Sequence, residues 1–356
     1  MNSFFKDRTI LVTGGSGSFG KVIVRRLLER SPRVVRVYSR DESKHFDMRH
    51  EFGKRADVRF LVGDIRDRGR LLRAMEDVEI VYHAAGLKHV VSCEYNPFEA
   101  VKTNIIGTQN VIDAAMHVRA QKVIFTSTDK AVNPCNTMGT SKLMAEKLMT
   151  AANQYRGSRR TIFATVRFGN VLGSRGSVVP HFMRQLREHR KITVTDPDMT
   201  RYVMSEAHAV DLVLKATELA RGGEIFILKM PAIRVGDLAE VMVEDYAAAN
   251  GLPVESIEVQ TIGAQPGEKP FEGLMTSQER FRALELPGMF VVKPPVTDLI
   301  DANYDYPGAR PVAVTRYTSS AQDLLTKDEI RGMLRETGLA AGDAAGTPES
   351  VPQYSS

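Results

Sequence analysis

The amino-acid sequence predicts an α/β fold, a doubly wound parallel sheet joined to a smaller α+β lobe. Through the first two-thirds of the chain, short β-branched runs alternate with amphipathic segments. The runs are apolar almost throughout, which is typical of strands covered by helices on both faces. After about residue 173 this alternation stops, and helical and extended segments mix. Alternating strands and helices form βαβ units, so we expect the parallel sheet first and the lobe after it.

The expected elements follow this pattern in order. After the first run, Ile23 and Leu27 lie four apart, as on one face of a helix, and Leu71 and Met75 repeat that spacing. Predicted strands occupy residues 9–12, 34–38, 58–62, 79–82, 122–125, 161–166, 224–228 and 258–262. Predicted helices in the second part occupy residues 179–188, 206–220 and 235–250. We expect one domain over 1–173, a lobe made mainly from 174–335 with some interleaving of the chain, and a disordered tail at 340–356.

Composition and charge exclude several classes of protein. The 356 residues are 43% hydrophobic with a net charge of +5, which excludes a disordered chain. No apolar run approaches the ~18 residues of a membrane helix, and no long Lys/Arg block or tryptophan indicates nucleic acid. Cys93 and Cys135 are too few for a disulfide framework, and the histidines lack metal-binding spacing. We expect a cytoplasmic protein with no metal, no membrane segment and no nucleic-acid partner.

A glycine-rich turn follows the first predicted strand and opens the first helix. Gly14, Gly17 and Gly20 are spaced three apart. Without Cβ atoms the turn lets a pyrophosphate approach the backbone, and the helix N-terminus offers unpaired N–H groups to the anion. We therefore expect residues 1–173 to bind a dinucleotide. The expected contacts of the turn are Gly14, Ser16, Gly17, Ser18, Phe19 and Gly20.

The end of the second predicted strand bears on which dinucleotide binds. Ser39, Arg40, Asp41 and Lys44 lie there. An acidic side chain alone favours the ribose 2′-hydroxyl of NAD, whereas Arg40 and Lys44 can pair with the 2′-phosphate of NADP. We predict NADP as the cofactor and keep NAD as the alternative.

The ends of the third and fourth strands complete the expected cofactor site. Asp64, beside Ile65, is placed to accept a hydrogen bond from the adenine amino group. Ala84 and Ala85 are small residues where the backbone has to pass close to the cofactor. All these segments fall at the carboxyl ends of strands, where open α/β sheets bind ligands.

The fifth strand ends in residues that carry chemistry. Thr128, Asp129 and Lys130 lie at its end, and Met138 and Lys142 share one face of the next helix. At this point the chain resembles the extended short-chain dehydrogenase/reductases, in which a tyrosine and a lysine at that spacing work with a Ser/Thr of the preceding strand. Thr128 and Lys142 match, whereas Met138 replaces the tyrosine. A thioether cannot exchange a proton, so Asp129 and Lys130 become the candidate acid and base.

A narrower resemblance is to the UDP-N-acetylglucosamine 4,6-dehydratases of capsule and O-antigen polysaccharide biosynthesis. Their signature is present as Ser127-Thr128-Asp129-Lys130-Ala131, and some members carry methionine at the position of Met138. The likeness covers residues 5 to about 295 and implies a Rossmann domain that binds NADP, a UDP-sugar substrate and a homo-oligomer. It places Lys88, Asn104 and Lys142 at the cofactor. It places Lys88, Ser127, Thr128, Met138, Asn170, Val178 and Arg201 at the substrate.

The implied reaction moves hydride from C4 of the sugar, eliminates water across C5 and C6, and returns hydride to C6. Lys130 removes the C5 proton, Asp129 protonates the departing C6 hydroxyl, and Thr128 hydrogen-bonds the C4 oxygen. A free lysine has a pKa of ~10.4, so Lys130 needs a downward shift of ~3–4 units, from desolvation and a neighbouring nicotinamide cation. Water, Asp129 and Thr128 are all candidates to accept the O4 proton. We expect inversion at C5, with retention as the alternative.

Two other functions stay open. A nucleotide-sugar epimerase or simple sugar dehydrogenase shares the fold, but the missing tyrosine disfavours it because no other evident group exchanges the O4 proton. A non-enzymatic NADP-sensing protein is consistent with the loss of the tyrosine but not with an intact Asp129–Lys130 pair.

Overall fold

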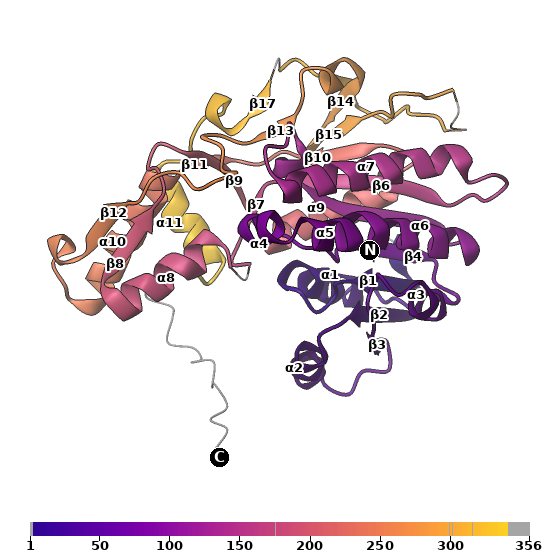
Figure 1. Ribbon diagram of the computed structural model, residues 1–356, viewed down its shortest axis with the longest axis horizontal. Helices are drawn as coiled ribbons and strands as arrows, with labels where there is room; N and C mark the ends of the chain where they lie inside the picture. Colours follow the sequence, from indigo (N-terminus) through magenta and orange to yellow (C-terminus); the bar gives the residue numbers. More distant parts are fainter. Residues whose placement is uncertain (1–2, 175, 299, 301, 315, 341–356) are drawn as a thin grey trace.

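A ten-stranded sheet forms the centre of the molecule in the computed structural model, which describes residues 3–174, 176–298, 300, 302–314 and 316–340 (Figure 1). The strand order is β16-β14-β15-β10-β6-β5-β4-β1-β2-β3. From β10 to β3 all neighbours are parallel, which confirms the predicted fold class. The tail expected at 340–356 lies, apart from Ala340, outside the described residues.

The parallel strands agree with the predicted ones to within a few residues. They are β1 (Thr9–Thr13), β2 (Val34–Ser39), β3 (Val58–Val62), β4 (Ile80–His83), β5 (Lys122–Thr128), β6 (Ile162–Phe168) and β10 (Ile225–Leu228). The largest difference is β5, which was expected to stop at residue 125. Its polar end continues because Thr126, Ser127 and Thr128 pair with β6 through the backbone, which does not require apolar side chains.

The chain does not stay outside the main sheet after residue 173. Part of the later sequence returns to extend it, first as the parallel strand β10 and then as an antiparallel edge. That edge consists of β15 (Met289–Val292), β14 (Ala283–Leu286) and β16 (Arg310–Pro311). The interleaving is therefore extensive, and the chain first leaves the sheet after Phe168, a few residues before the expected boundary at 173.

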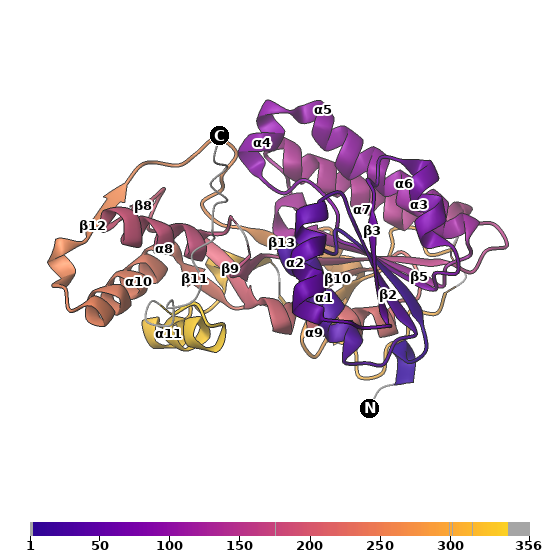
Figure 2. The ribbon, with the colours of Figure 1, turned by 90° about the horizontal axis from the view of Figure 1, so that it is seen from below.

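Helices cover both faces of the sheet (Figure 2). One face carries α1 (Ser18–Leu28) and α9 (Glu206–Leu219), with α2 (Glu42–Phe52) beside α1. The other face carries α3 (Arg68–Met75), α6 (Gly107–His117) and α7 (Thr137–Tyr155). The path into α6 runs through α4 (Val90–Tyr95), α5 (Pro97–Ala100) and a π-helical segment, η2 (Val101–Ile106).

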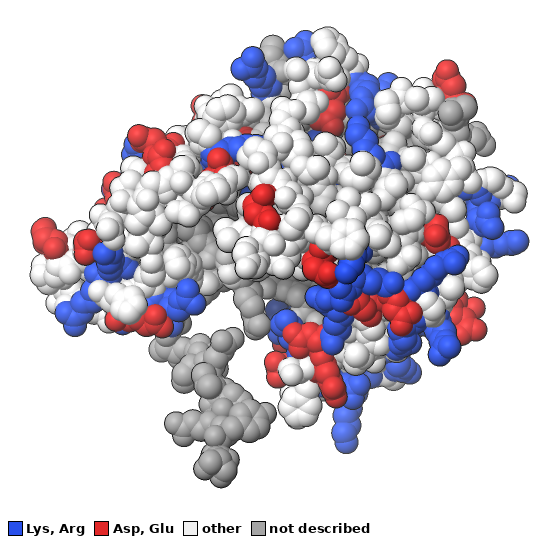
Figure 3. Space-filling view, viewed as in Figure 1, with Lys and Arg blue, Asp and Glu red and all other residues white. Residues whose placement is uncertain are grey.

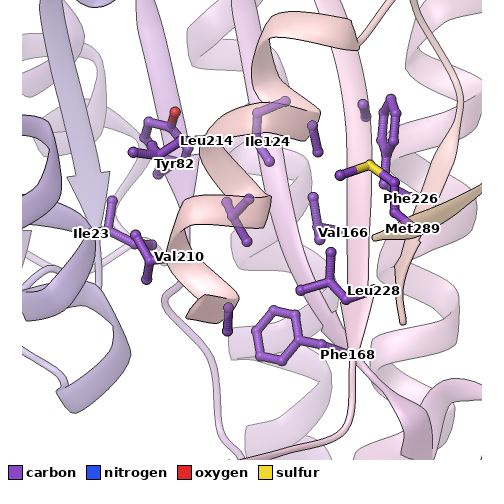
Figure 4. Packing of buried hydrophobic residues seen from close by; sticks show 14 of the residues in the cluster. Ile23, Tyr82, Ile124, Val166, Phe168, Val210, Leu214, Phe226, Leu228 and Met289 are labelled. Atoms are coloured by element: carbon purple, nitrogen blue, oxygen red, sulfur yellow. The ribbon is translucent and has the colours of Figure 1, made fainter. Parts of the chain in front are cut away.

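The main core lies between α9 and the sheet. Val210 and Leu214 of α9 pack toward Ile124 and Val166 of the central strands, and Phe168 closes the end of this layer (Figure 4). Val210 and Leu214 lie four residues apart, which places them on the one buried face of α9. Among the described residues, no helix combines the length and the apolar character that a membrane crossing requires.

A smaller lobe stands beside the carboxyl end of the sheet, at the left of Figure 1. Its strands are β7 (Asn170–Leu172), β8 (Lys191–Val194), β9 (Thr200–Ser205), β11 (Ala232–Arg234) and β12 (Glu258–Thr261). Its helices are α8 (Val178–His189), α10 (Val235–Asn250) and α11 (Lys327–Glu336). Phe182, Leu186 and Leu238 belong to its own buried core. A short ladder of β13 (Gly273–Met275) and β17 (Tyr317–Thr318) lies between this lobe and the sheet edge.

Short 3₁₀ turns complete the chain, namely η1 (Ser3–Phe5), η3 (Asp129–Ala131), η4 (Val254–Ser256), η5 (Glu279–Arg282) and η6 (Ser319–Ala321). On the face shown in Figure 3, acidic and basic side chains intermingle over the part of the molecule that contains α1, α2 and α3.

The strand order places β1 beside β4, and the chain leaves these two strands toward opposite sides of the sheet. Such a switch point opens a crevice at the carboxyl ends of the strands.

Candidate active site

The turn between β1 and α1 brings the backbone against the loop that follows β4. Gly14 has a φ of +67°, and a Cβ atom there would lie 2.7 Å from the backbone nitrogen of Ala85. A Cβ atom on Gly20 would lie 2.3 Å from the carbonyl oxygen of Gly14. Only glycine fits at both positions. The first turn of α1 therefore lines the crevice with bare backbone and N–H groups, an environment that suits an anion.

The end of β2 holds a small polar cluster. The hydroxyl of Ser39 lies 2.6 Å from that of Ser16 and 2.8 Å from Nε2 of His45, which ties the glycine-rich turn to α2. Asp41 caps α2 by accepting from the backbone N–H of Lys44, and it also pairs with the Lys44 ammonium. The Asp41 carboxylate thus interacts with Lys44 in the first turn of α2. The Arg40 side chain, in contrast, is largely exposed at the rim of the crevice.

The end of β3 is held by Arg66. Its side chain and backbone both donate to the Asp64 carboxylate, at 2.7 to 2.9 Å. Burial alone would raise the pKa of Asp64, but these hydrogen bonds hold it below its usual range. Asp64 therefore lines the crevice as a fixed carboxylate.

Asn104 holds the loop after β4, and Lys142 lies beside that loop, hydrogen-bonded to the end of β5. Asn104 accepts from the Leu87 N–H at 2.8 Å and donates to the Leu87 carbonyl at 3.1 Å. The Lys142 ammonium donates to the Thr126 carbonyl at 3.0 Å and lies 4.5 Å from the centre of the Phe125 ring. Burial lowers the pKa of Lys142 to about 8. A Cβ atom on Gly86 would lie 3.2 Å from the Lys142 nitrogen, so this glycine leaves the ammonium room beside the crevice.

The end of β5 brings together three of the predicted catalytic side chains. Thr128 donates to Oδ1 of Asp129 at 2.8 Å, and the Lys130 ammonium donates to the same oxygen at 3.0 Å. Asp129 is fully buried, and Lys130 is about 24% exposed. Thr128 and Lys130 line the crevice, so Asp129 communicates with it through these two neighbours.

The predicted lowering of the Lys130 pKa is wrong for this state of the protein. Burial acts in the predicted direction, but the carboxylates of Asp129 and Glu272 outweigh it and raise the pKa of Lys130 above its ordinary value. Glu272, whose Oε1 lies 3.7 Å from the Lys130 nitrogen, is the contributor that the local sequence did not reveal. In this state Lys130 is an ammonium at neutral pH.

Met138 occupies the helix position at which the resembling enzymes place a tyrosine. It is buried with Cys93, Ala100, Leu87 and Val90, yet it also contributes to the crevice wall. Its side chain is therefore both part of an apolar cluster and a lining of the crevice. The thioether of Met138 cannot transfer a proton, so at this position it offers the crevice only an apolar surface.

The crevice has a volume of about 730 Å³ and runs from the glycine-rich turn to the end of β6. Buried hydroxyl oxygens of Ser127 and Ser177 have no hydrogen-bond partner within the described part of the chain, so they are available to a bound molecule. Bare backbone at one end and unpartnered hydroxyls at the other fit an elongated ligand with a pyrophosphate, such as a dinucleotide.

Comparison with known proteins identifies the family. The family described as "Polysaccharide biosynthesis protein" matches residues 10–294. An uncharacterized membrane protein of Methanocaldococcus jannaschii is 49% identical over 336 residues, which are 94% of this chain and 98% of that protein. A UDP-glucose 4-epimerase of Rickettsia felis is 39% identical over 335 residues, 93% of this chain and 96% of that enzyme. The X-ray structure of Pen from Bacillus thuringiensis matches with a TM-score of 0.87 and 45% identity, covering 95% of this chain and all of Pen.

The chain belongs to this polysaccharide biosynthesis family. The recognition of an extended short-chain dehydrogenase/reductase is confirmed, and the family match spans nearly the same residues as the resemblance seen in the sequence.

Most of the residues predicted for the site line the crevice of this family member. They are Gly14, Ser16, Gly17, Ser18, Phe19, Gly20, Ser39, Arg40, Asp41, Lys44, Asp64, Ile65, Ala84, Ala85, Lys88, Ser127, Thr128, Lys130, Met138, Lys142 and Asn170. Four others lie behind its wall. Asp129 is buried, Asn104 holds the loop after β4, Val178 begins α8 against the core of the lobe, and Arg201 donates to the Thr200 carbonyl at 2.9 Å.

Several lining residues were missed by the sequence analysis. Phe168 is the last residue of β6, Gly169 follows it, and Ser177 is the residue before α8. The sequence pattern could have indicated these residues, because they lie at the end of a strand and at the start of a helix. Glu272 had no such signal, because it is brought to Lys130 from a Gly- and Pro-rich segment far along the chain.

Proposed function

We propose that this protein is an NADP-dependent 4,6-dehydratase acting on UDP-N-acetylglucosamine or a close UDP-hexosamine. The observation that carries the proposal is the contact set of Thr128, Asp129 and Lys130 at the end of β5, together with a methionine at position 138. Thr128 and Lys130 both donate to the same oxygen of Asp129 at the end of a strand that would face the cofactor. An elimination requires an acid and a base held together in this way.

The fit of the crevice to a dinucleotide supports the cofactor. The glycine-rich turn and the start of α1 would hold the pyrophosphate, Asp64 the adenine, and Lys142 the nicotinamide ribose. Arg40 at the rim and Lys44 on α2 are the cations that would meet a 2′-phosphate, which favours NADP over NAD. The dinucleotide held by these residues would supply the hydride acceptor for C4 and the hydride donor for C6.

The Thr128–Asp129 hydrogen bond supports a route for the O4 proton in place of the missing tyrosine. A proton leaving O4 passes to the Thr128 hydroxyl, whose own proton has an acceptor in Asp129 at 2.8 Å. Asp129 then holds the proton that the departing C6 hydroxyl needs. Because Asp129 is buried, that proton returns to the crevice through the same hydroxyl.

Lys130 is the proposed base for the C5 proton. Lys130 is one of the residues that line the crevice, whereas its two carboxylate partners are buried and do not line it. The ammonium has to lose a proton to one of these partners before its lone pair can act. Asn170, Ser127, Lys88 and Met138 would surround the sugar diphosphate. The substrate contacts of Arg201 and Val178 and the inversion at C5 rest on the resemblance.

The decisive experiment incubates the protein with NADP⁺ and UDP-N-acetylglucosamine in D₂O and follows the product by proton NMR. We expect a 4-keto-6-deoxy sugar with deuterium at C5, and the couplings around C5 report inversion or retention. Lys130→Ala should abolish dehydration while NADP binding stays unchanged. Lys215→Ala, at an exposed position on α9, is the matched control and should keep full turnover. Full turnover by Lys130→Ala would overturn the mechanism.

A UDP-sugar 4-epimerase is the second candidate, favoured by the 39% identity to the Rickettsia felis enzyme. The same NMR experiment separates the two functions, because a 4-epimerase would give the C4 epimer with its C6 hydroxyl intact and no deuterium at C5. UDP-glucose is included as a second substrate. Cofactor binding without turnover of either sugar would favour an NADP-sensing protein instead.

A further inference from the structure

Glu272 is one of the two buried carboxyls beside Lys130, and the proposed reaction does not assign it a step of its own. It directly precedes β13, only 3% of its surface is exposed, and its Oε1 lies 3.7 Å from the Lys130 nitrogen. On the other side of that nitrogen, Asp129 accepts its hydrogen bond at 3.0 Å. The Lys130 ammonium therefore lies between two carboxylates, only one of which is its neighbour in the sequence.

The backbone of Glu272 is held firmly, whereas its carboxyl group is not. Its N–H donates to the Ser319 hydroxyl at 3.0 Å, and its carbonyl accepts from the Ser319 N–H at 2.8 Å. The carboxyl oxygen Oε2 is buried without a hydrogen bond in the described structure, although the Lys269 ammonium lies 3.8 Å away. A buried oxygen in this condition costs free energy, so protonation of the carboxyl group relieves part of that cost, and Oε1 is the oxygen that faces the Lys130 nitrogen.

The charges around Glu272 come from three segments. Lys130 and Asp129 belong to η3, Arg201 to β9, and Lys269 to the loop before β13. Burial raises the pKa of Glu272, and Asp129 adds to that effect against the three cations. Glu272 is therefore easier to protonate than an exposed glutamate, while its neighbour Lys130 carries the proton.

We propose that Glu272 receives the proton that Lys130 must give up before it can act as the base, and returns that proton afterwards. The Lys130 nitrogen and Oε1 of Glu272, 3.7 Å apart at rest, first approach to hydrogen-bond distance. An N–H bond of Lys130 then breaks as an O–H bond forms on Oε1, and the lone pair left on Lys130 takes the C5 proton. The charges of ammonium and carboxylate disappear together, so the exchange needs no proton from solvent. Glu272 acts through Lys130 and is a positioning residue for the proposed dehydration, on which this inference rests.

The exchange predicts a distinctive pH dependence. With Glu272 present, the resting and the reactive forms bind the same number of protons, so kcat is independent of pH around neutrality. In Glu272→Gln the Lys130 proton has to leave for solvent. We expect kcat of that variant to fall at least about tenfold at pH 7 and to rise with pH, with KM unchanged. Glu268→Gln, an exposed carboxyl in the same loop, is the matched control and should behave as wild type.

A second readout does not depend on turnover. In protein labelled with ¹³C at the lysine ε carbons, the Lys130 signal is assigned by its loss in Lys130→Arg and titrated without substrate. We expect the pKa of Lys130 to be lower in Glu272→Gln than in wild type, because one of its two carboxylates is gone. An unchanged Lys130 titration would overturn the inference, as would a kcat that is unaffected or that falls equally at every pH. If the Lys130 titration shifts in Glu272→Gln but the wild-type protein dehydrates no UDP-sugar, the proposed function is wrong, while the interaction of Lys130 with Glu272 is still supported.

Discussion

Replacing Arg167 with methionine should lower the free energy of unfolding by about 3–5 kcal/mol at neutral pH, the cost of leaving a buried charge without its partner. The guanidinium of Arg167 lies on β6 and is only 1% exposed. It donates to both oxygens of Glu146 at 3.0 and 2.6 Å, and to both oxygens of Glu279 at 3.1 and 3.0 Å. It also donates to the Leu274 carbonyl at 2.9 Å.

The magnitude follows from what the substitution leaves behind. Two carboxylates, Glu146 on α7 and Glu279 on η5, would share a buried site without a cation, so the cost belongs at the upper end of that range. In the wild type, burial would raise the pKa of Glu279, but Arg167 and the neighbouring hydrogen bonds hold it below its usual value. Without Arg167 the carboxyl groups take up protons more readily in the folded state. The deficit of the variant should therefore shrink as the pH falls from 7 toward 5.

The assay is urea unfolding of wild type and Arg167→Met at pH 7.5 and pH 5.5. Arg25→Met, which removes a half-exposed partner of Glu51, is the control and should cost less than about 1 kcal/mol. Adding Glu146→Gln and Glu279→Gln to Arg167→Met should restore part of the stability, because no unpaired charge is then left. A deficit below about 1 kcal/mol at pH 7.5, or one that grows at pH 5.5, would refute this reasoning.

Three further outcomes are expected. Burial lowers the pKa of His83 to about 3. Between pH 6.5 and that pKa, each unit by which the pH falls should therefore lower the free energy of unfolding by about 1.4 kcal/mol. Urea unfolding at a series of pH values checks this, and His83→Gln should flatten the dependence. Gly14→Ala should lose NADP binding in calorimetry because its Cβ meets backbone, whereas Gly53→Ala, at a φ of +66° in open space, should keep it. Phe226→Ala should cost about 3–5 kcal/mol in urea unfolding, because the ring is fully buried between α9 and the sheet edge.

The features of the structure that are determined by short local stretches of sequence could be predicted from the sequence alone. The parallel strands, the glycine-rich turn and the positions of Thr128 and Lys130 follow from local apolar runs and from the rule that ligands meet the carboxyl ends of strands. The protonation state of Lys130 could not be predicted, because it depends on Glu272, which no local pattern connects to it. The return of residues 283–292 as an antiparallel edge was missed for the same reason, since short strands in a Gly- and Pro-rich segment show no periodicity of their own.

The interleaved chain has a mechanical consequence for the crevice. The polypeptide passes between the main sheet and the lobe repeatedly, over one residue between Phe168 and Asn170, directly from Ser205 to Glu206, and over three residues between Leu228 and Ala232. Each crossing is short, and together the crossings tether the lobe to the sheet at several points, so rotation about any one of them is restrained by the others. We therefore expect the distance between lobe and sheet to be set when the chain folds. A sugar nucleotide would then be admitted by rearrangement of individual side chains and loops, with little rotation of one part of the molecule against the other.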